Sequence, residues 1–239
     1  MNEQYQALRA ELIKNQYANI IWITFVAFAL APMMGGIFML ILRNPDAIAK
    51  AGALNTKAQT MNFSVDWGSY LVLLTQAVGV GGLLIFGFVA SWIFGREYSD
   101  GTAKDLLALP TSRAKIINAK FFVYGTWCFA LAISNLLLGV LIGMLLQIDP
   151  LVNNSISAVI WNYLITTVLA MLVGMPVAFF ALCGKGYLTP LGLVTLMLVF
   201  AQVMAAKRYG AVFPWSVRRF LAVQRANLDL SLALRVMLY

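Results

Sequence analysis

Residues 67–95 read WGSYLVLLTQAVGVGGLLIFGFVASWIFG and contain no charged side chain. A helix that crosses a lipid bilayer needs about 20 consecutive, mostly apolar residues. This stretch is longer than that. Its apolar residues also run on without the alternation along segments of about 10 residues that marks a membrane β-strand. The stretch therefore predicts a membrane-spanning α-helix.

Four further stretches without charge can each hold one span: 15–42, 121–148, 150–184 and 186–206. Of all residues, 62% are hydrophobic and 11% charged, whereas about 25% are charged in a typical soluble domain. This composition excludes a soluble globular protein. It predicts an all-α integral membrane protein, a bundle of five to six transmembrane helices. The five predicted spans are about 20–42, 68–95, 121–147, 156–183 and 188–206.

Residues 1–18 are a polar leader in which apolar side chains recur every three to four positions, with charged side chains on other faces. The apolar side chains are those of Tyr5, Leu8, Leu12 and Ile13. This pattern favours an interfacial amphipathic helix on the bilayer surface over an ordinary polar leader. The apolar run that follows is longer than the roughly 7–15-residue core of a signal peptide, so we expect a retained first span.

Lysine and arginine are unequally distributed among the connections, and cytoplasmic loops are enriched in both. One side carries eight of them: two in the leader, five in loop 96–120 and one at Lys185. The other side carries three, all in loop 43–67. We therefore expect a multi-pass protein of the plasma (inner) membrane with a cytoplasmic N-terminus. The basic tail 207–239 breaks the bias: either it returns inside by an irregular route, or a sixth span is altered or truncated.

Composition and local motifs also exclude several kinds of site. Histidine is absent, which removes histidine-based zinc sites and catalytic triads. Cys128 and Cys183 are interpreted as small core residues. Gly184-Lys185 lacks the flanking residues of a phosphate-binding loop. We therefore expect no cofactor, no metal and no enzymatic activity. The net charge of +8 is interpreted as loop charge rather than as a nucleic-acid interface.

None of the five predicted spans contains Asp, Glu, Lys or Arg. Ionisable residues inside membranes are costly and mark proton or ion pathways, so their absence argues against an ion-coupled carrier. Neutral polar residues usually bond between helices, although they could line a permeation path. They are Thr75, Gln76, Ser91, Ser134, Asn135, Asn162, Thr166, Thr167 and Gln202. Small residues four apart predict close helix packing: Gly139 and Gly143; Gly87, Ser91 and Gly95; and Ala170, Gly174 and Ala178.

The segment 96–120, REYSDGTAKDLLALPTSRAKIINAK, separates the second and third predicted spans. Asp100-Gly101 predicts a turn. Thr102, with the aspartate three positions later, can cap a short helix that ends before Pro110. Thr111 or Ser112 can cap a second helix that leads into the third span.

The short helix would carry three leucines, Leu106, Leu107 and Leu109. This is more apolar surface than a solvated loop needs. The leucines either dock into a groove on a soluble partner or pack on the bilayer surface or on the bundle itself.

At this loop the sequence resembles the membrane subunits of export-type ABC transporters, the ABC-2-type permeases. That family carries the motif Glu-(aromatic)-x-x-Gly-Thr-x-(basic)-x-Leu-Leu-x-x-Pro-x-(Ser/Thr)-Arg between its second and third spans. The matching residues here are Glu97, Tyr98, Gly101, Thr102, Lys104, Leu106, Leu107, Pro110, Ser112 and Arg113, with Lys120 opening the third span. The leader resembles the family's entry helix, and Phe213-Pro214-Trp215 resembles the segment before its last span.

The resemblance implies a permease of six spans that acts as a homodimer or with a second permease subunit, together with separate ABC ATP-binding subunits. Loop 96–120 would be the ATPase-coupling element, and its predicted coupling residues are those of the motif without Ser112. Substrate would pass between the permease subunits, with antibiotic or bacteriocin resistance as a family role. The alternative is an ATP-independent polytopic membrane protein, either a carrier or a scaffold.

Overall fold

The computed structural model describes residues 3–16, 18–43, 65–102, 112–149, 156–184, 186 and 188–206. These residues form an all-α structure, as predicted. The helices are α1 (Glu3–Gln16), α2 (Ile20–Arg43), α5 (Trp67–Ser99), α7 (Arg113–Leu145), α8 (Ile156–Cys183) and α9 (Leu188–Ala206).

Four helices are long and apolar enough to cross a bilayer: α2, α5, α7 and α8. The protein is therefore a multi-pass membrane protein. Helix α9 has 19 residues and lies where the fifth span is expected, but it is not among these four helices. The fifth span stays a prediction, and the tail 207–239 lies outside the described residues.

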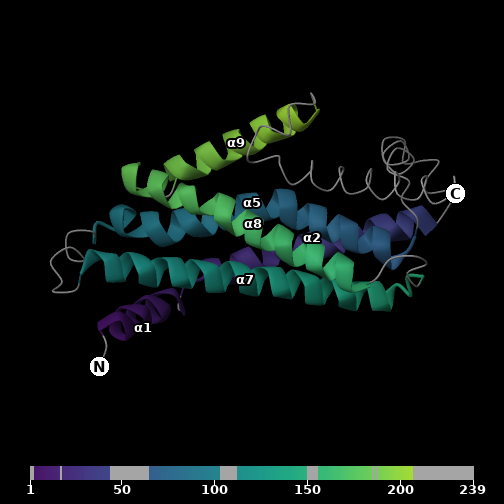
Figure 1. Cartoon of the computed structure of the whole chain (residues 1–239), viewed down its shortest axis with the longest axis horizontal. Helices are drawn as coiled ribbons and strands as arrows, with labels where there is room; N and C mark the ends of the chain where they lie inside the picture. Colours follow the sequence, from purple (N-terminus) through teal and green to yellow (C-terminus); the bar gives the residue numbers. More distant parts are fainter. Residues whose placement is uncertain are drawn as a thin grey trace, which may run out of the picture.

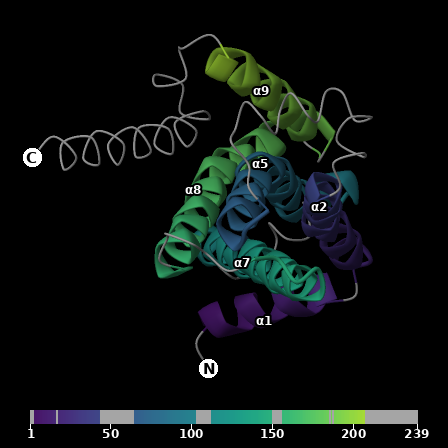
Figure 2. The same ribbon diagram turned by 90° about the vertical axis from the view of Figure 1, so that its right-hand side faces the viewer.

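Helix α5 is the central element of the bundle. It packs against α2, α7, α8 and α9, and most extensively against α8. Successive long helices run in opposite directions along the long axis (Figure 1). Seen along that axis, α1 lies on the outer side of α7 and α9 lies on the opposite side of the molecule (Figure 2). The bundle end that carries α1 also carries the end of α5 and the start of α7; we call it the α1 end.

Two helices extend beyond their predicted spans at the α1 end. Helix α5 continues to Ser99 and α7 begins at Arg113, whereas the predicted loop occupied 96–120. The spans were predicted from charge-free sequence, and a charge marks where a helix leaves the hydrocarbon, not where its backbone hydrogen bonds end. The start of α7 after Ser112 agrees with the helix predicted to lead into the third span. As a result, Glu97 and Lys120 lie inside long helices and are buried.

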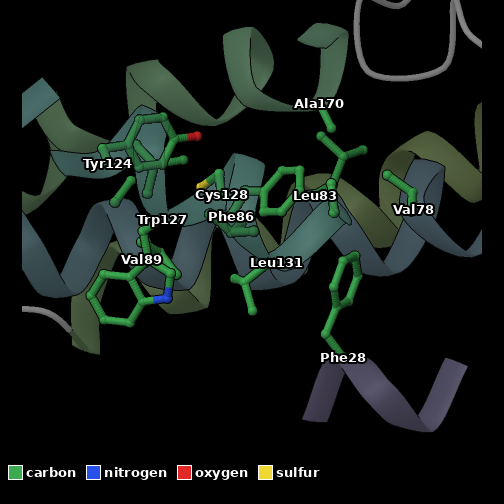
Figure 3. Packing of buried hydrophobic residues seen from close by; sticks show 14 of the residues in the cluster. Phe28, Val78, Leu83, Phe86, Val89, Tyr124, Trp127, Cys128, Leu131 and Ala170 are labelled. Carbon is green, nitrogen blue, oxygen red and sulfur yellow. The ribbon is translucent and has the colours of Figure 1, made fainter. Parts of the chain in front are cut away.

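Aromatic and aliphatic side chains from several helices form the core of the bundle. Phe28 of α2, Phe86 of α5 and Leu131 of α7 are all buried in one cluster (Figure 3). The rings of Phe28 and Phe86 lie 5.9 Å apart. Cys128 is buried here as predicted, but Cys183 at the end of α8 is exposed, so its assignment to the core was wrong.

The small residues of α7 bring it close to α5. Gly139 faces Leu74, and Gly143 faces the indole of Trp67. A Cβ atom at either glycine would overlap these side chains. The close packing predicted from this spacing is therefore present between α5 and α7.

Buried hydrogen bonds surround the proline of α2. They involve the backbone carbonyls of Phe28 and Pro32 and the side chains of Tyr70, Asn135 and Tyr163, and we call these five residues the Pro32 node. Pro32 has no backbone N–H, so the carbonyl of Phe28 four residues earlier lacks its helical donor. The Asn135 amide of α7 donates to that carbonyl at 2.9 Å. Tyr70 of α5 donates to the Pro32 carbonyl at 3.2 Å. The node therefore joins α2 to its neighbours.

The other end of the node reaches α8. The Tyr163 hydroxyl donates to the Ala132 carbonyl at 2.7 Å and lies 3.4 Å from Asn135 Oδ1. Asn135 thus bonds between helices, as expected for a polar residue in a span. By contrast, the hydroxyls of Thr75, Ser134 and Thr167 donate to carbonyls of their own helices.

Candidate functional site

The predicted coupling residues lie around the junction of α5 and α7. Glu97 and Tyr98 belong to the last turns of α5, Gly101 and Thr102 to the turn that follows, and Arg113 begins α7. All of these except Glu97 are exposed. The remaining members, Lys104, Leu106, Leu107 and Pro110, lie outside the described residues, as does the predicted short helix.

Helix α5 ends through a glycine in the left-handed region. Gly101 has φ 73°, a conformation that costs glycine little. Its N–H donates to the Tyr98 carbonyl at 3.3 Å, and the Thr102 hydroxyl lies 3.5 Å from the Glu97 carbonyl, to which it donates. These bonds satisfy carbonyls that the helix end leaves without partners. The turn predicted at Asp100-Gly101 is confirmed.

Helix α7 begins after Ser112, one of the two residues predicted to cap it. Ser112 has extended backbone at φ −64° and ψ 136°, and its carbonyl accepts from Lys115 N at 3.0 Å. The connection between the two helices is therefore residues 100–112, which is shorter than the predicted loop.

Four charged side chains meet where α1, α5 and α7 come together. We call Glu11, Lys14, Glu97 and Lys120 the charge cluster. Glu97 Oε1 lies 2.7 Å from Lys14 Nζ and 2.9 Å from Lys120 Nζ. Lys120 Nζ also lies 3.2 Å from Glu11 Oε1. The side chains of Glu97 and Lys120 are each only 5% exposed, so the ion pair between them is shielded from water, whereas the Lys14 side chain is 32% exposed.

Lys120 is surrounded by oxygen atoms that match its three N–H groups. Besides the two carboxylates, its ammonium donates to the backbone carbonyl of Ile93 at 3.1 Å. A buried ion pair is tolerated when its geometry is good and the remaining donors are satisfied. The cluster contains two carboxylates and two ammonium groups, so its formal charge is balanced.

Helix α1 turns its polar side toward the bundle. Glu11 and Asn15 are buried, and the Asn15 amide donates to the Glu11 carbonyl at 2.9 Å. Tyr5, Leu12 and Ile13 are 58%, 44% and 49% exposed. Apolar side chains that point away from the protein favour contact with lipid. Leu8, the fourth apolar residue of the predicted pattern, instead packs against the core, and the interfacial helix stays a prediction.

Arg96 adds a second tie between α5 and α1. Its Nη1 donates to the Lys14 carbonyl at 3.3 Å, and its Nε lies 3.3 Å from the exposed Asp100 carboxylate. The guanidinium carbon lies 5.6 Å from the ring centre of Trp92, within cation–π range. The end of α5 is therefore joined to α1 through backbone as well as side-chain acceptors.

The arrangement is suited to holding helices together. Within the described ranges, no group of three or more His, Cys, Asp or Glu residues could hold a metal ion. What these residues provide is a buried ionic junction between α1, the last turns of α5 and the first turns of α7.

Sequence reasoning missed this junction because it assigned each charge to its own segment. Glu97 was a loop residue, Lys120 opened a span, and Glu11 and Lys14 lay on the free faces of a leader. One signal could have pointed to it: Leu8, Glu11 and Asn15 follow helical spacing along one face of the leader.

Comparisons with known proteins match most of the chain. A family model described as "ABC-2 family transporter protein" matches residues 7–202, from within α1 to within α9. The bacitracin transport permease protein BCRB of Bacillus licheniformis is 29% identical over 152 residues, which cover 63% of this chain and 70% of that protein. No solved structure matches the chain.

Proposed function

The chain belongs to the ABC-2 family of transporter proteins, and from that membership we propose that it is the membrane subunit of an ATP-driven exporter. The match over residues 7–202 carries this proposal, because it includes the four described helices that are long enough to cross a membrane. It favours transport over the alternative of a scaffold without transport activity. The comparisons thus agree with the family expected from the loop motif.

In this proposal the energy comes from a separate ATP-binding subunit that docks on residues 100–112, which we call the coupling loop. Two observations support that role. The loop is held between the Gly101 turn and the Ser112 cap, so both of its ends are ordered by helices. Glu97 and Lys120 lie on the two helices that flank the loop, and both are buried. A displacement of the loop would therefore act on helix segments that ion pairs hold together.

The proposed orientation puts the α1 end in the cytoplasm, where an ATP-binding subunit has access to nucleotide. The lysine and arginine bias of the connections supports it. The second subunit of the permease is either another copy of this chain or a related chain. Trp22, Val26 and Met34 of α2 are exposed apolar side chains, available to lipid or to that subunit.

We further propose that the substrate is an antibiotic of the kind named for the relative, which is a bacitracin transport permease. Export of an antibiotic from a cell raises the concentration that the cell survives. Bacitracin is therefore the first compound to test.

The test replaces two of the three leucines of the coupling loop, in the double variant Leu106→Asp with Leu107→Asp. Charge at an apolar docking surface costs desolvation without a partner. We expect loss of co-purification with an ATP-binding subunit encoded beside this chain, and loss of the bacitracin survival that the pair provides. The level of the protein in membranes should stay the same.

The matched control changes the same leucines to methionine, which keeps volume and apolar character and should retain binding and survival. Unchanged co-purification of the aspartate variant would refute the coupling assignment. Survival of the wild-type pair no better than that of cells without it would refute the substrate.

A further inference from the structure

We propose that Lys120 is a positioning residue for coupling: by holding Glu11 and Glu97 together it makes α1, the end of α5 and the start of α7 move as one body when the coupling loop is displaced. The inference rests on the proposed function and assigns a role to residues that the loop motif leaves unexplained. It concerns which helices move when the coupling loop is displaced, not where the ATP-binding subunit binds.

The first step is the position of Lys120 between two helices. Its ammonium lies 2.9 Å from the Glu97 carboxylate on α5 and 3.2 Å from the Glu11 carboxylate on α1. It is itself part of α7. One buried cation therefore contacts acidic groups from the two other helices that meet at this point.

The second step is the cost of separating these groups. A buried charge that loses its partner is left without solvation, so breaking such a pair is strongly unfavourable. Apolar surfaces can slide past one another with little loss, because the hydrophobic effect is not directional. The charge cluster therefore restricts sliding of the three helices past one another more strongly than apolar side chains of similar volume would.

The third step is the short path from the cluster to the first span. Helix α1 ends at Gln16 and α2 begins at Ile20. Ala18 N donates to the Asn15 carbonyl at 2.9 Å, and Ile21 N donates to the Ala18 carbonyl at 3.1 Å. These two hydrogen bonds keep the end of α1 close to the start of α2. A displacement of α1 is thus passed to the start of α2.

The experiment uses a charge-balanced variant, Glu11→Gln with Lys120→Met. It removes one acid and one base and leaves the Glu97–Lys14 pair, whose atoms lie 2.7 Å apart, so the fold keeps a neutral cluster. Spin labels replace Leu12 of α1 and Ile117 of α7, both exposed. The distance between the labels is measured in the complex with the ATP-binding subunit, with and without ATP.

We expect the wild-type distance distribution to stay narrow in both states. In E11Q/K120M it should about double in width when ATP binds, because α1 and α7 no longer share one geometry. The variant should still co-purify with the ATP-binding subunit, since the coupling loop is untouched. A purely structural role for Lys120 predicts the opposite: the balanced variant folds and its distribution stays narrow.

The matched control is the other balanced variant, Lys14→Met with Glu97→Gln. It leaves the Glu11–Lys120 contact at 3.2 Å, so α1 stays joined to α7 and the distribution should stay narrow. A distribution that broadens equally in both variants, or in neither, would overturn the role of Lys120 alone. A wild-type chain that does not bind the ATP-binding subunit would overturn the proposed function, and this inference with it.

Discussion

The charge cluster and the Pro32 node are both buried and polar, and both join helices that are distant in sequence, yet their chemistry differs. The charge cluster pairs Glu11, Glu97 and Lys120 at the α1 end. The Pro32 node uses only an amide and hydroxyls, donated to backbone carbonyls along the middle of the bundle. The difference corresponds to position along the bundle. The charged junction lies at the end of the long helices, and the neutral junction lies in their middle.

Depth matters because a charge at the centre of a bilayer costs more than one near its surface. In the middle, the proline of α2 removes one backbone donor, and a neutral amide is sufficient to replace it. At the α1 end, α1 must be held to two helices without a continuous apolar face. Paired charges can do this there because a charge near the bilayer surface costs less than one at its centre.

The largest expected effect tests the charge side of this comparison. Lys120→Met leaves the Glu11 carboxylate buried without a cation and should lower the free energy of unfolding by about 3–5 kcal/mol. The measurement is the thermal midpoint of the detergent-purified protein. Asp100→Asn is the control, because an exposed pair such as Arg96–Asp100 is worth about 0–1 kcal/mol. Equal losses in the two variants would mean that burial of the cluster adds nothing.

A moderate effect is expected at the Pro32 node. Asn135→Leu leaves the Phe28 carbonyl without its donor and should cost about 1–3 kcal/mol in the same assay. Ser134→Ala is the neighbouring control, since Ser134 donates only within its own helix, to the Leu131 carbonyl at 2.8 Å. If Asn135→Leu proved as costly as Lys120→Met, the distinction between charged and neutral junctions would fail.

The smallest effect sharpens the account of the node itself. Tyr163→Phe removes a donor to the Ala132 carbonyl, which lies within α7 and keeps its helical donor, so a loss of about 0.5–1.5 kcal/mol is expected. Because Tyr163 Oη and Asn135 Oδ1 lie 3.4 Å apart, the double variant with Asn135→Leu should lose less than the two single losses added together. Strict additivity would show that the two residues act independently.

Much of the fold could be predicted because each span must satisfy one strong condition. An uninterrupted apolar segment of spanning length forms a helix in a bilayer, since its backbone N–H and C=O groups must bond within the segment. The bounds of α8 and α9 agree with the predicted 156–183 and 188–206. Helix α5 continues past Gly95 into charged sequence, which the charge-free stretch alone did not predict. Helix α7 begins after Ser112, as predicted for the helix that leads into the third span.

The candidate site was predictable only in its local parts. The turn at Gly101 is governed by backbone chemistry that neighbouring residues determine, and it was identified correctly. Ser112, one of the two predicted caps, takes the N-cap position, but its side chain makes no capping hydrogen bond. The burial of Glu97 was not predicted, because it depends on Lys14 and Lys120, which are 83 and 23 residues away along the chain. Only one member of the charge cluster, Glu97, belonged to the predicted coupling residues.

The amino-acid sequence by itself determined that the chain is a helical membrane protein and which segments can span, because hydrophobic length and local turn chemistry are properties of consecutive residues. Only the tertiary structure decided which charges meet. It also decided that α1 presents polar residues to the bundle, and that Asn135 replaces the donor missing at Pro32. These outcomes depend on distances between helices, and a buried charge or carbonyl is satisfied by whichever group packing brings within bonding reach.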